Sequence, residues 1–141
     1  MKKILSSIFL LISMFASSQM LDPVNWTFSQ KQVSETEIEL IFQATIEDHF
    51  HLYSQFISND GPTPTTFRFE ESDFYQRVGE TQEGSSIEAF DPIWETKLKY
   101  FEHKAVFKQK IKVLGKDPFI VKGEIDFIAC DSSQCFFPLF L

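Results

Sequence analysis

Two cysteines, Cys130 and Cys135, are the residues of this chain whose type and spacing point most directly to chemistry. They are the only cysteines among 141 residues, and a spacer of Asp, Ser, Ser and Gln separates them. Such a spacer is typical of a tight turn. Two cysteines that flank a tight turn can reach the Cα separation of about 5.5 Å that a disulfide needs.

The spacing leaves three interpretations of the pair open. A redox-active pair would exchange its disulfide with a partner thiol, and a loop tip gives an attacking thiolate access. A structural clip is the alternative, although closing a loop of about six residues stabilises a fold by only about 2 kcal/mol. Metal binding is the third, but zinc prefers four ligands, and nothing in the sequence places His49, His51 or His103 beside the pair. No metal and no other cofactor is predicted.

Asp131 directly follows Cys130, and its charge affects whether the pair would attack another disulfide or be attacked by a partner thiolate. A neighbouring negative charge disfavours a thiolate, and the spacer contains no basic residue to oppose that charge. We therefore expect the pair to be the disulfide that is attacked, not a low-pKa nucleophile that attacks.

Alternation of apolar and polar residues predicts β-strands over most of the chain that would carry this pair. The clearest strands are expected at 38–46, 104–113 and 119–130, and the last of these leads into the cysteine pair. Shorter strands are expected at 26–32, 50–54, 66–70, 75–78 and 98–102. Turn signals separate the strands at 58–62, 83–86, 91–92 and 115–118.

Seven or eight short strands with regular turns, and no sustained helical period, predict an all-β sandwich of one domain. The 17 phenylalanines are then mostly the filling between two sheets. The antibody pattern of two distant cysteines around a core tryptophan is absent. We therefore do not expect the cysteine pair to link the two sheets.

Residues 1–18 are expected to be a cleaved signal peptide, which leaves residues 19–141 as the mature domain. Two lysines open the segment, the apolar stretch 4–15 is too short to span a membrane, and small residues precede the cleavage point. Cleavage removes both lysines and no acid, so the formal net charge goes from −7 to −9. An acidic domain is not expected to bind nucleic acid, and export favours disulfides.

Several segments together resemble the N-terminal periplasmic domain of the thiol:disulfide interchange protein DsbD. The first of these segments is the cysteine pair followed in sequence by an aromatic residue and Pro138. The others are residues 23–29, 49–55, 61–67 and 98–101. The resemblance implies a periplasmic, immunoglobulin-like β-sandwich with a redox-active pair. In that family a thioredoxin-like or transmembrane thiol–disulfide protein supplies electrons, and periplasmic thiol oxidoreductases receive them.

The resemblance also implies a cap loop that shields the cysteines until a partner docks. The matching stretch here is Phe-Asp-Pro-Ile-Trp-Glu, in which Trp94 is expected to cover the pair, with the acids Asp91 and Glu95 nearby. Tyr53 and His51 match positions that face the pair. Core packing is the alternative role for Trp94 and Tyr53, and a strand-surface position is the alternative for His51.

The chain departs from the family pattern behind the pair. The spacer is one residue shorter, and Phe136-Phe137-Pro138 stands where Leu-Pro-Pro is usual. The sequence ends six residues after Cys135, where the family continues into a further strand. Either residues 139–141 replace part of that strand or the reading frame is truncated, so an open sheet edge is expected near the pair.

We therefore expect an exported thiol–disulfide interchange domain of the protein-disulfide reductase type, relaying electrons through Cys130 and Cys135. The alternative is a non-catalytic β-sandwich binding module with a structural disulfide. The sequence contains no transmembrane electron carrier, so the relay would need another protein to supply reductant.

Overall fold

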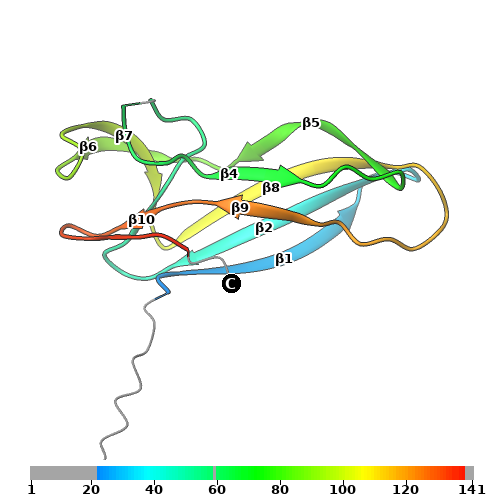
Figure 1. Ribbon diagram of the computed structural model, residues 1–141, viewed down its shortest axis with the longest axis horizontal. Coiled ribbons are helices and arrows are strands. Elements are labelled where there is room, and N and C mark those ends of the chain that lie inside the picture. Colours follow the sequence, from blue (N-terminus) through cyan, green and yellow to red (C-terminus); the bar gives the residue numbers. More distant parts are fainter. Residues whose placement is uncertain (1–21, 59, 139–141) are drawn as a thin grey trace, which may run out of the picture.

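The computed structural model describes residues 22–58 and 60–138. This part of the chain contains eleven antiparallel strands, joined by turns and loops, and no helix (Figure 1). The prediction of an all-β sandwich is confirmed. Nothing in this part could cross a membrane as a helix. The expected signal peptide, residues 1–18, and the expected substitute for a last strand, residues 139–141, lie outside the described residues.

One layer of the sandwich is a four-stranded sheet in the order β1-β2-β8-β5. Its strands are, in that order, Val24–Gln32, Glu37–Ile46, Lys104–Val113 and Tyr75–Glu83. The alternation predicted for 38–46 and 104–113 is realised here, because β2 and β8 each turn one row of side chains toward the core.

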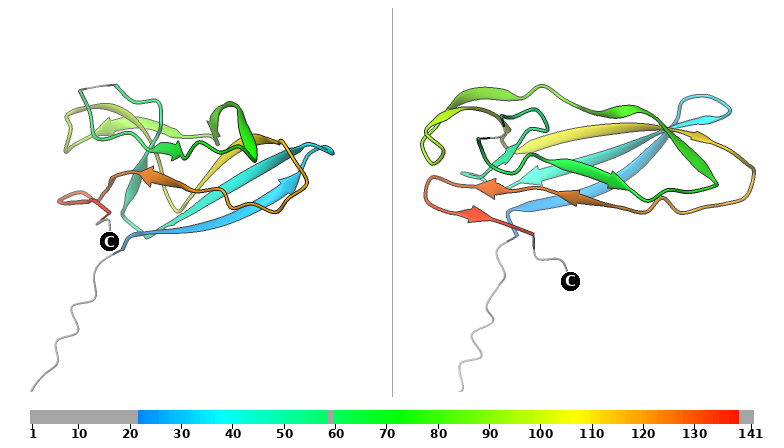
Figure 2. Two further views of the ribbon diagram at one scale, coloured as in Figure 1. Left: turned by 45° about the vertical axis from the view of Figure 1, so that its right-hand side comes forward. Right: turned by 45° about the horizontal axis from the view of Figure 1, so that its top comes forward.

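The other layer consists of two smaller sheets side by side (Figure 2). The five-stranded sheet has the order β11-β10-β3-β7-β6, with strands Cys135–Phe136, Ala129–Cys130, His51–Tyr53, Thr96–Phe101 and Ile87–Asp91. The two-stranded sheet pairs β4 (Thr66–Phe69) with β9 (Gly123–Asp126). Because β10 follows β9 after two residues, one stretch of chain serves both sheets.

Aromatic side chains fill the space between the layers, as predicted from the phenylalanine content. Phe107 is fully buried on β8, and its ring packs against those of Phe67, Phe101 and Trp26 at centroid distances of 5.0, 5.5 and 5.8 Å. The buried members of this main core are Val24, Ala44, Ile46, Phe50, Leu52, Phe67, Phe101, Ala105, Phe107, Phe127 and Ala129.

The prediction of one continuous strand over 119–130 is wrong. Residues 119–122 are not in a strand, and Phe127 and Ile128 interrupt pairing between β9 and β10. Both residues are buried, but Phe127 belongs to the main core and Ile128 to a separate cluster around the cysteines. Strand β6 was also not predicted, although the turn expected at 91–92 does follow it.

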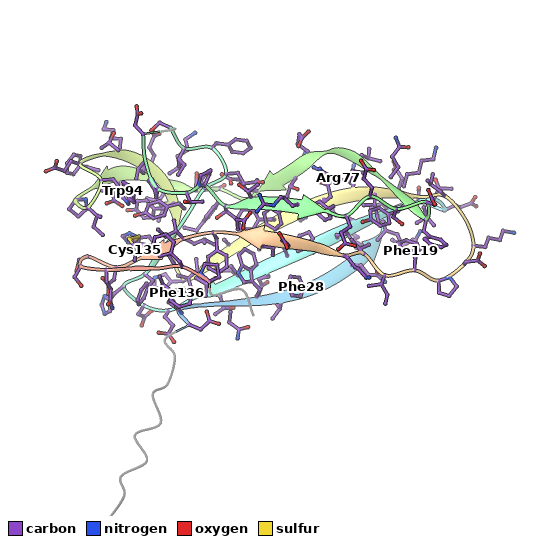
Figure 3. All side chains as sticks on the ribbon, viewed as in Figure 1. Phe28, Arg77, Trp94, Phe119, Cys135 and Phe136 are labelled. Atoms are coloured by element: carbon purple, nitrogen blue, oxygen red, sulfur yellow. A yellow bond between two sulfur atoms is a disulfide. The ribbon has the colours of Figure 1, made fainter. Side chains whose placement is uncertain are left out.

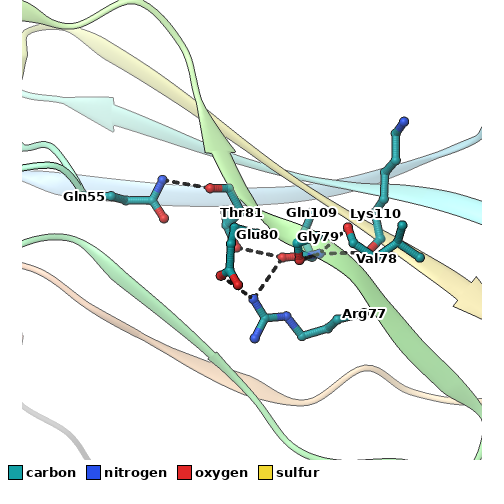
Figure 4. Close-up of polar contacts among 8 residues, drawn as sticks. All are labelled: Gln55, Arg77, Val78, Gly79, Glu80, Thr81, Gln109 and Lys110. Atoms are coloured by element: carbon teal, nitrogen blue, oxygen red, sulfur yellow. Dashed lines mark hydrogen bonds and ion pairs between the residues drawn. The ribbon is translucent and has the colours of Figure 1, made fainter.

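A buried polar side chain explains an irregularity in β5. Gln109 lies on the core face of β8 with no exposed surface, and its amide donates to the carbonyls of Val78 and Gly79 (Figure 4). Its carbonyl accepts a hydrogen bond from the Thr81 hydroxyl at 2.9 Å. The pairing register of β5 shifts at this point, and Gly79 has a φ of 70°, which favours glycine. The glutamine therefore satisfies the polar groups that the bulge turns inward.

Replacing Gln109 with leucine is expected to lower the free energy of unfolding by about 1–3 kcal/mol, because buried carbonyl and hydroxyl groups lose their partner. Urea denaturation would measure this loss. The matched control, Gln76→Leu at an exposed position of the same β5 strand, is expected to stay within about 0.5 kcal/mol of the wild type. Equal effects of the two substitutions would contradict the assignment.

Candidate functional site

The two cysteines are joined by a disulfide across the β10–β11 hairpin. Cys130 and Cys135 are directly opposed in the register, and their Cα atoms are 4.0 Å apart. The backbone N–H of Asp131 donates to the carbonyl of Gln134, so the cysteines occupy the adjacent non-hydrogen-bonded pair, where opposed strands approach most closely. The disulfide lies within one sheet, which confirms that it does not link the two layers.

The carboxylate of Asp131 organises the turn between the cysteines. Its Oδ1 accepts hydrogen bonds from the backbone N–H groups of Ser133 and Gln134, both at 2.8 Å. These two bonds hold the pKa of Asp131 below its ordinary value, so the group keeps its charge into the acid range. The negative charge that the sequence places beside Cys130 is therefore also a structural part of the turn.

The two half-cystines differ in exposure. Cys130 has no exposed surface, whereas Cys135 is half-buried. The difference follows from the topology, since β10 lies between β3 and β11 while β11 is the edge strand. The expectation that a loop tip exposes the pair is therefore wrong for Cys130 and holds only for Cys135.

One face of the five-stranded sheet carries the predicted site residues. His51 is the register partner of Cys130, and Tyr53 that of Tyr100. Directly paired residues project from the same face, so these side chains share a face with the disulfide. The opposite face of the same strands carries Leu52, which belongs to the main core. The sheet thus separates the candidate site from the core.

The hairpin between β6 and β7 covers part of this face. Trp94 is half-buried at its tip and packs against the cluster that contains Tyr53 and Cys130, as Cys135 also does. Figure 3 shows Trp94 and Cys135 at the same end of the molecule. The indole Nε1 of Trp94 is buried and makes no hydrogen bond of normal geometry to another described residue, but its N–H lies close enough to the Tyr53 hydroxyl to act on the pKa of that phenol. The turn, called the cap below, therefore lies against the cluster that includes Cys130.

Asp91 fastens this cap to the sheet. It is 3% exposed, and its Oδ2 accepts a hydrogen bond of 2.6 Å from the Tyr53 hydroxyl. Its Oδ1 accepts from the backbone N–H groups of Ile93 and Trp94 at 2.8 and 3.2 Å. Burial, followed by the contact with Asp91, raises the pKa of Tyr53 above its ordinary range, so the phenol remains a donor.

The structure places Glu95 and Pro138 farther from the disulfide, whereas His51 lies opposite Cys130 but directs its ring to other partners. The imidazole of His51 stacks on Tyr100 at 4.3 Å and contacts Glu102 at 3.0 Å. Glu95 is exposed with a φ of 52°, and no hydrogen bond or ion pair joins it to another described residue. Pro138 follows the end of β11 and is not in the cluster around the disulfide.

Sequence reasoning missed the apolar walls of the site. Leu98, Tyr100 and Ile128 are buried around Cys130, with Ile57 and Ala89 packed against them. Ile128 had a usable signal, since it stands two residues before Cys130 and therefore on the same face of a strand. The other walls come from strands distant in sequence.

The three histidines lie together, although nothing in the sequence indicated it. His49, His51 and His103 line one groove of about 560 Å³, which Asp131 and Ser132 of the cysteine turn also line. Within residues 22–58 and 60–138, no group of three or more potential ligands has a geometry suited to a metal ion. The groove thus brings the three imidazoles to one surface beside the cysteine turn.

No family model, no curated protein and no solved structure matches the chain. The resemblance to the DsbD domain therefore stays a prediction, and the geometry of the site carries the functional argument.

Removing the Tyr53 hydroxyl tests the attachment of the cap. Tyr53→Phe is expected to cost about 1.5–3 kcal/mol of unfolding free energy, because the acceptor is a buried carboxylate. Tyr75→Phe is the matched control, since that hydroxyl donates to the neutral carbonyl of Glu70, and about 1 kcal/mol is expected. Urea denaturation of both variants would give the two values, and a larger loss for Tyr75→Phe would contradict the assignment.

The difference in unfolding free energy between the wild type and Tyr53→Phe is expected to depend on pH. Since the pKa of Tyr53 is raised in the folded state above its ordinary value of 10, its contribution to stability is complete below pH 10 and is lost as the pH rises further. The stability difference between wild type and Tyr53→Phe should therefore be constant up to about pH 9 and shrink above pH 10.

Proposed function

We propose that the protein is a thiol–disulfide interchange domain that relays electrons through Cys130 and Cys135. The observation that carries this proposal is the unequal accessibility of the pair: Cys135 is partly exposed on an edge strand, and Cys130 is fully buried in a cluster against which Trp94 packs. Exchange needs one sulfur that a partner can reach and a second that stays protected. This arrangement supplies both.

A purely structural role is less well supported by the position of the disulfide. The loop that it closes is short, so the expected stabilisation is only about 2 kcal/mol. The hairpin is also held by its own hydrogen bond and by the Asp131 carboxylate, independently of the sulfur atoms. A disulfide that served stability alone would gain more by joining distant strands.

In the proposed first half-reaction a partner thiolate attacks Sγ of Cys135. The Cys130–Cys135 bond breaks as the mixed disulfide forms, and the Cys130 sulfur leaves as a thiolate that takes up a proton. The second thiol of the partner then attacks the partner's sulfur in the mixed disulfide and releases Cys135. Two electrons and two protons have moved to the domain, and the partner holds the new disulfide.

The second half-reaction returns these electrons to a client disulfide. The Cys135 thiolate attacks the client, one client sulfur leaves and takes up a proton, and Cys130 resolves the mixed disulfide on Cys135. The domain is oxidised again and the client carries two thiols. Asp131 disfavours a thiolate on its neighbour Cys130, which favours Cys135 as the attacking sulfur of the reduced pair. In the first half-reaction the same charge slows the departure of Cys130, so there it is the exposure of Cys135 that supports attack on Cys135.

The proposed partners and location follow from this chemistry and from the sequence. A thioredoxin-like or transmembrane thiol–disulfide protein would supply electrons, and thiol oxidoreductases of the periplasm would receive them. A protein that carries a signal peptide meets an oxidising compartment, where the pair would be kept as a disulfide between turnovers. The cap would open when a partner docks.

Single-cysteine variants test the relay. Cys130→Ser leaves the accessible Cys135, so it is expected to form a mixed disulfide with a dithiol partner such as thioredoxin. Cys135→Ser leaves only the buried sulfur and is expected to trap far less of the same partner. Non-reducing electrophoresis with mass spectrometry of the linked peptides would measure both.

The same experiment separates the relay from the binding module. If neither variant forms a mixed disulfide, or if the disulfide of the folded wild type resists excess dithiothreitol, the pair is a structural clip. Equal trapping by the two variants would overturn the assignment of Cys135 as the attacked sulfur.

Truncating the cap tests its protective role. Trp94→Ala is expected to speed reduction of the disulfide by dithiothreitol by about tenfold, corresponding to about 1.4 kcal/mol of lost cap packing. Phe90→Ala is the matched control, because Phe90 lies on the same hairpin but is 62% exposed. Alkylation of free thiols over time would give the rates. Identical rates for wild type and Trp94→Ala would show that the tryptophan does not limit access.

A further inference from the structure

The hairpin that carries the disulfide ends the five-stranded sheet with an open edge. Strand β11 pairs with β10 on one side, and no other described strand pairs with it on the opposite side. Figure 2 shows it in red as the outer strand of the hairpin. An unpaired strand edge presents backbone N–H and C=O groups to which an extended segment can bond.

Cys135 is the residue of β11 whose own backbone groups point out of this edge. The cysteines form a non-hydrogen-bonded pair, because the bond from the Asp131 N–H to the Gln134 carbonyl belongs to the adjacent position. Residues of such a pair direct their N–H and C=O groups away from each other. The groups of Cys130 therefore point to β3, whereas those of Cys135 point to the open edge.

The same edge is the side from which the Cys135 sulfur is open to attack. A thiolate displaces a disulfide sulfur in line, so it approaches Sγ of Cys135 along the extension of the bond from Cys130. That bond crosses the hairpin from β10 to β11, and its extension leads toward the open edge. Cys135 is also the half-cystine with exposed surface. The unpaired backbone groups and the line of attack therefore lie on one side of one residue.

A segment that pairs with Cys135 is held at a distance suited to a mixed disulfide. Bonds to both the N–H and the C=O of one residue make a hydrogen-bonded pair, in which the Cα atoms are about 5.5 Å apart and both side chains lie on the same face. Disulfides join cysteines whose Cα atoms are about 4.4–6.8 Å apart. A cysteine of the added segment opposite Cys135 is therefore within bonding range of its sulfur.

The surface of the hairpin favours an uncharged or basic segment. Residues 127–138 contain one charged side chain, that of Asp131, and no lysine or arginine. Phe137, which follows β11, is 59% exposed and gives this edge an apolar neighbour. The negative charge of the turn repels an acidic segment and attracts a basic one. A second copy is disfavoured as the occupant because the chain carries a formal net charge of −7.

We propose that the open edge of β11 is the docking site for the client of the relay, which adds an extended, neutral or basic segment there with its reacting cysteine opposite Cys135. Backbone bonds to Cys135 hold this segment, as in other cases of strand addition to a sheet edge. The site therefore selects cysteines on edge strands or in locally unfolded chain and rejects those within helices, whose backbone groups are bonded internally. This docking mode rests on the proposed relay and names the kind of client that the relay serves.

Peptides with and without the required backbone N–H test the docking. In Cys130→Ser the Cys135 thiolate attacks a peptide of β-forming residues whose single cysteine is activated with thionitrobenzoate, and the thionitrobenzoate that leaves as the mixed disulfide forms gives the rate. N-methylation of the peptide cysteine removes the N–H that bonds to the Cys135 carbonyl. It is expected to slow the reaction about tenfold, which corresponds to about 1.4 kcal/mol. N-methylation of the next peptide residue is the matched control and is expected to change the rate by less than about twofold, because that N–H points away from β11.

The charge preference has its own pair of peptides. A peptide with one lysine beside the cysteine is expected to react several-fold faster at low salt than the same peptide with glutamate in that place, because of the charge of Asp131. Equal rates, or faster reaction of the acidic peptide, would overturn the assignment of a neutral or basic segment.

Hydrogen exchange of the protein amides gives an independent measurement. In the mixed disulfide of Cys130→Ser with the unmethylated peptide, the Cys135 amide is expected to exchange at least about tenfold more slowly than in the unbound variant. The Phe136 amide is the internal reference, because it points to β10 in both states and its exchange rate should change little.

The outcomes separate the docking from the relay. Equal rates for the two methylated peptides, or a Cys135 amide that stays unprotected in the mixed disulfide, would overturn the docking while trapping of thioredoxin still supported the relay. A Cys135 amide that is protected in the unbound protein and loses this protection on dilution would also overturn the docking, since a second copy would then occupy the edge. If Cys135 reacts with neither thioredoxin nor any peptide, the relay fails and the docking fails with it.

Discussion

The pairing of β10 with β3 on one side and β11 on the other is the contact on which the rest of the site depends. Strand β10 has only two residues, and their side chains lie on opposite faces of the sheet. Ala129 points into the main core, and Cys130 points to the outer face. A slip of one residue would exchange these faces, placing a sulfur in the core and removing the disulfide partner. The packing of Ala129 among the core aromatic residues therefore fixes the position of Cys130.

The cap depends on a second, polar constraint. One carboxylate, that of Asp91, accepts hydrogen bonds from the Tyr53 hydroxyl and from two backbone groups of the cap turn. A buried carboxylate is costly unless such donors surround it, so the turn and the sheet are coupled through this group. Apolar packing alone would leave the cap free to settle in several positions. The carboxylate selects one of them.

Local patterns predicted much of the fold and the central pair of the site. The period of two in β2 and β8 was readable because one face of each strand is apolar, with Gln109 of β8 as the exception. The alternation also placed Phe127 and Ile128 on opposite faces, but the interruption of pairing there was not readable, because it arises where the chain changes its partner strand from β4 to β3. In β6 the apolar residues Ile87, Ala89 and Phe90 fall on both faces, which hides the alternation. The unequal burial of the cysteines and the gathering of the histidines arise from strand order, which no local pattern contains.

The Asp131 carboxylate has a consequence for the cysteine turn that does not involve the sulfur atoms. Its Oδ1 accepts hydrogen bonds from the backbone N–H groups of Ser133 and Gln134, and neither bond includes a cysteine. The turn is therefore expected to keep its shape when the disulfide is reduced, with Cys130 and Cys135 still opposed across the hairpin. The oxidised and reduced forms would then differ little in backbone structure, so the covalent bond could re-form without a conformational search.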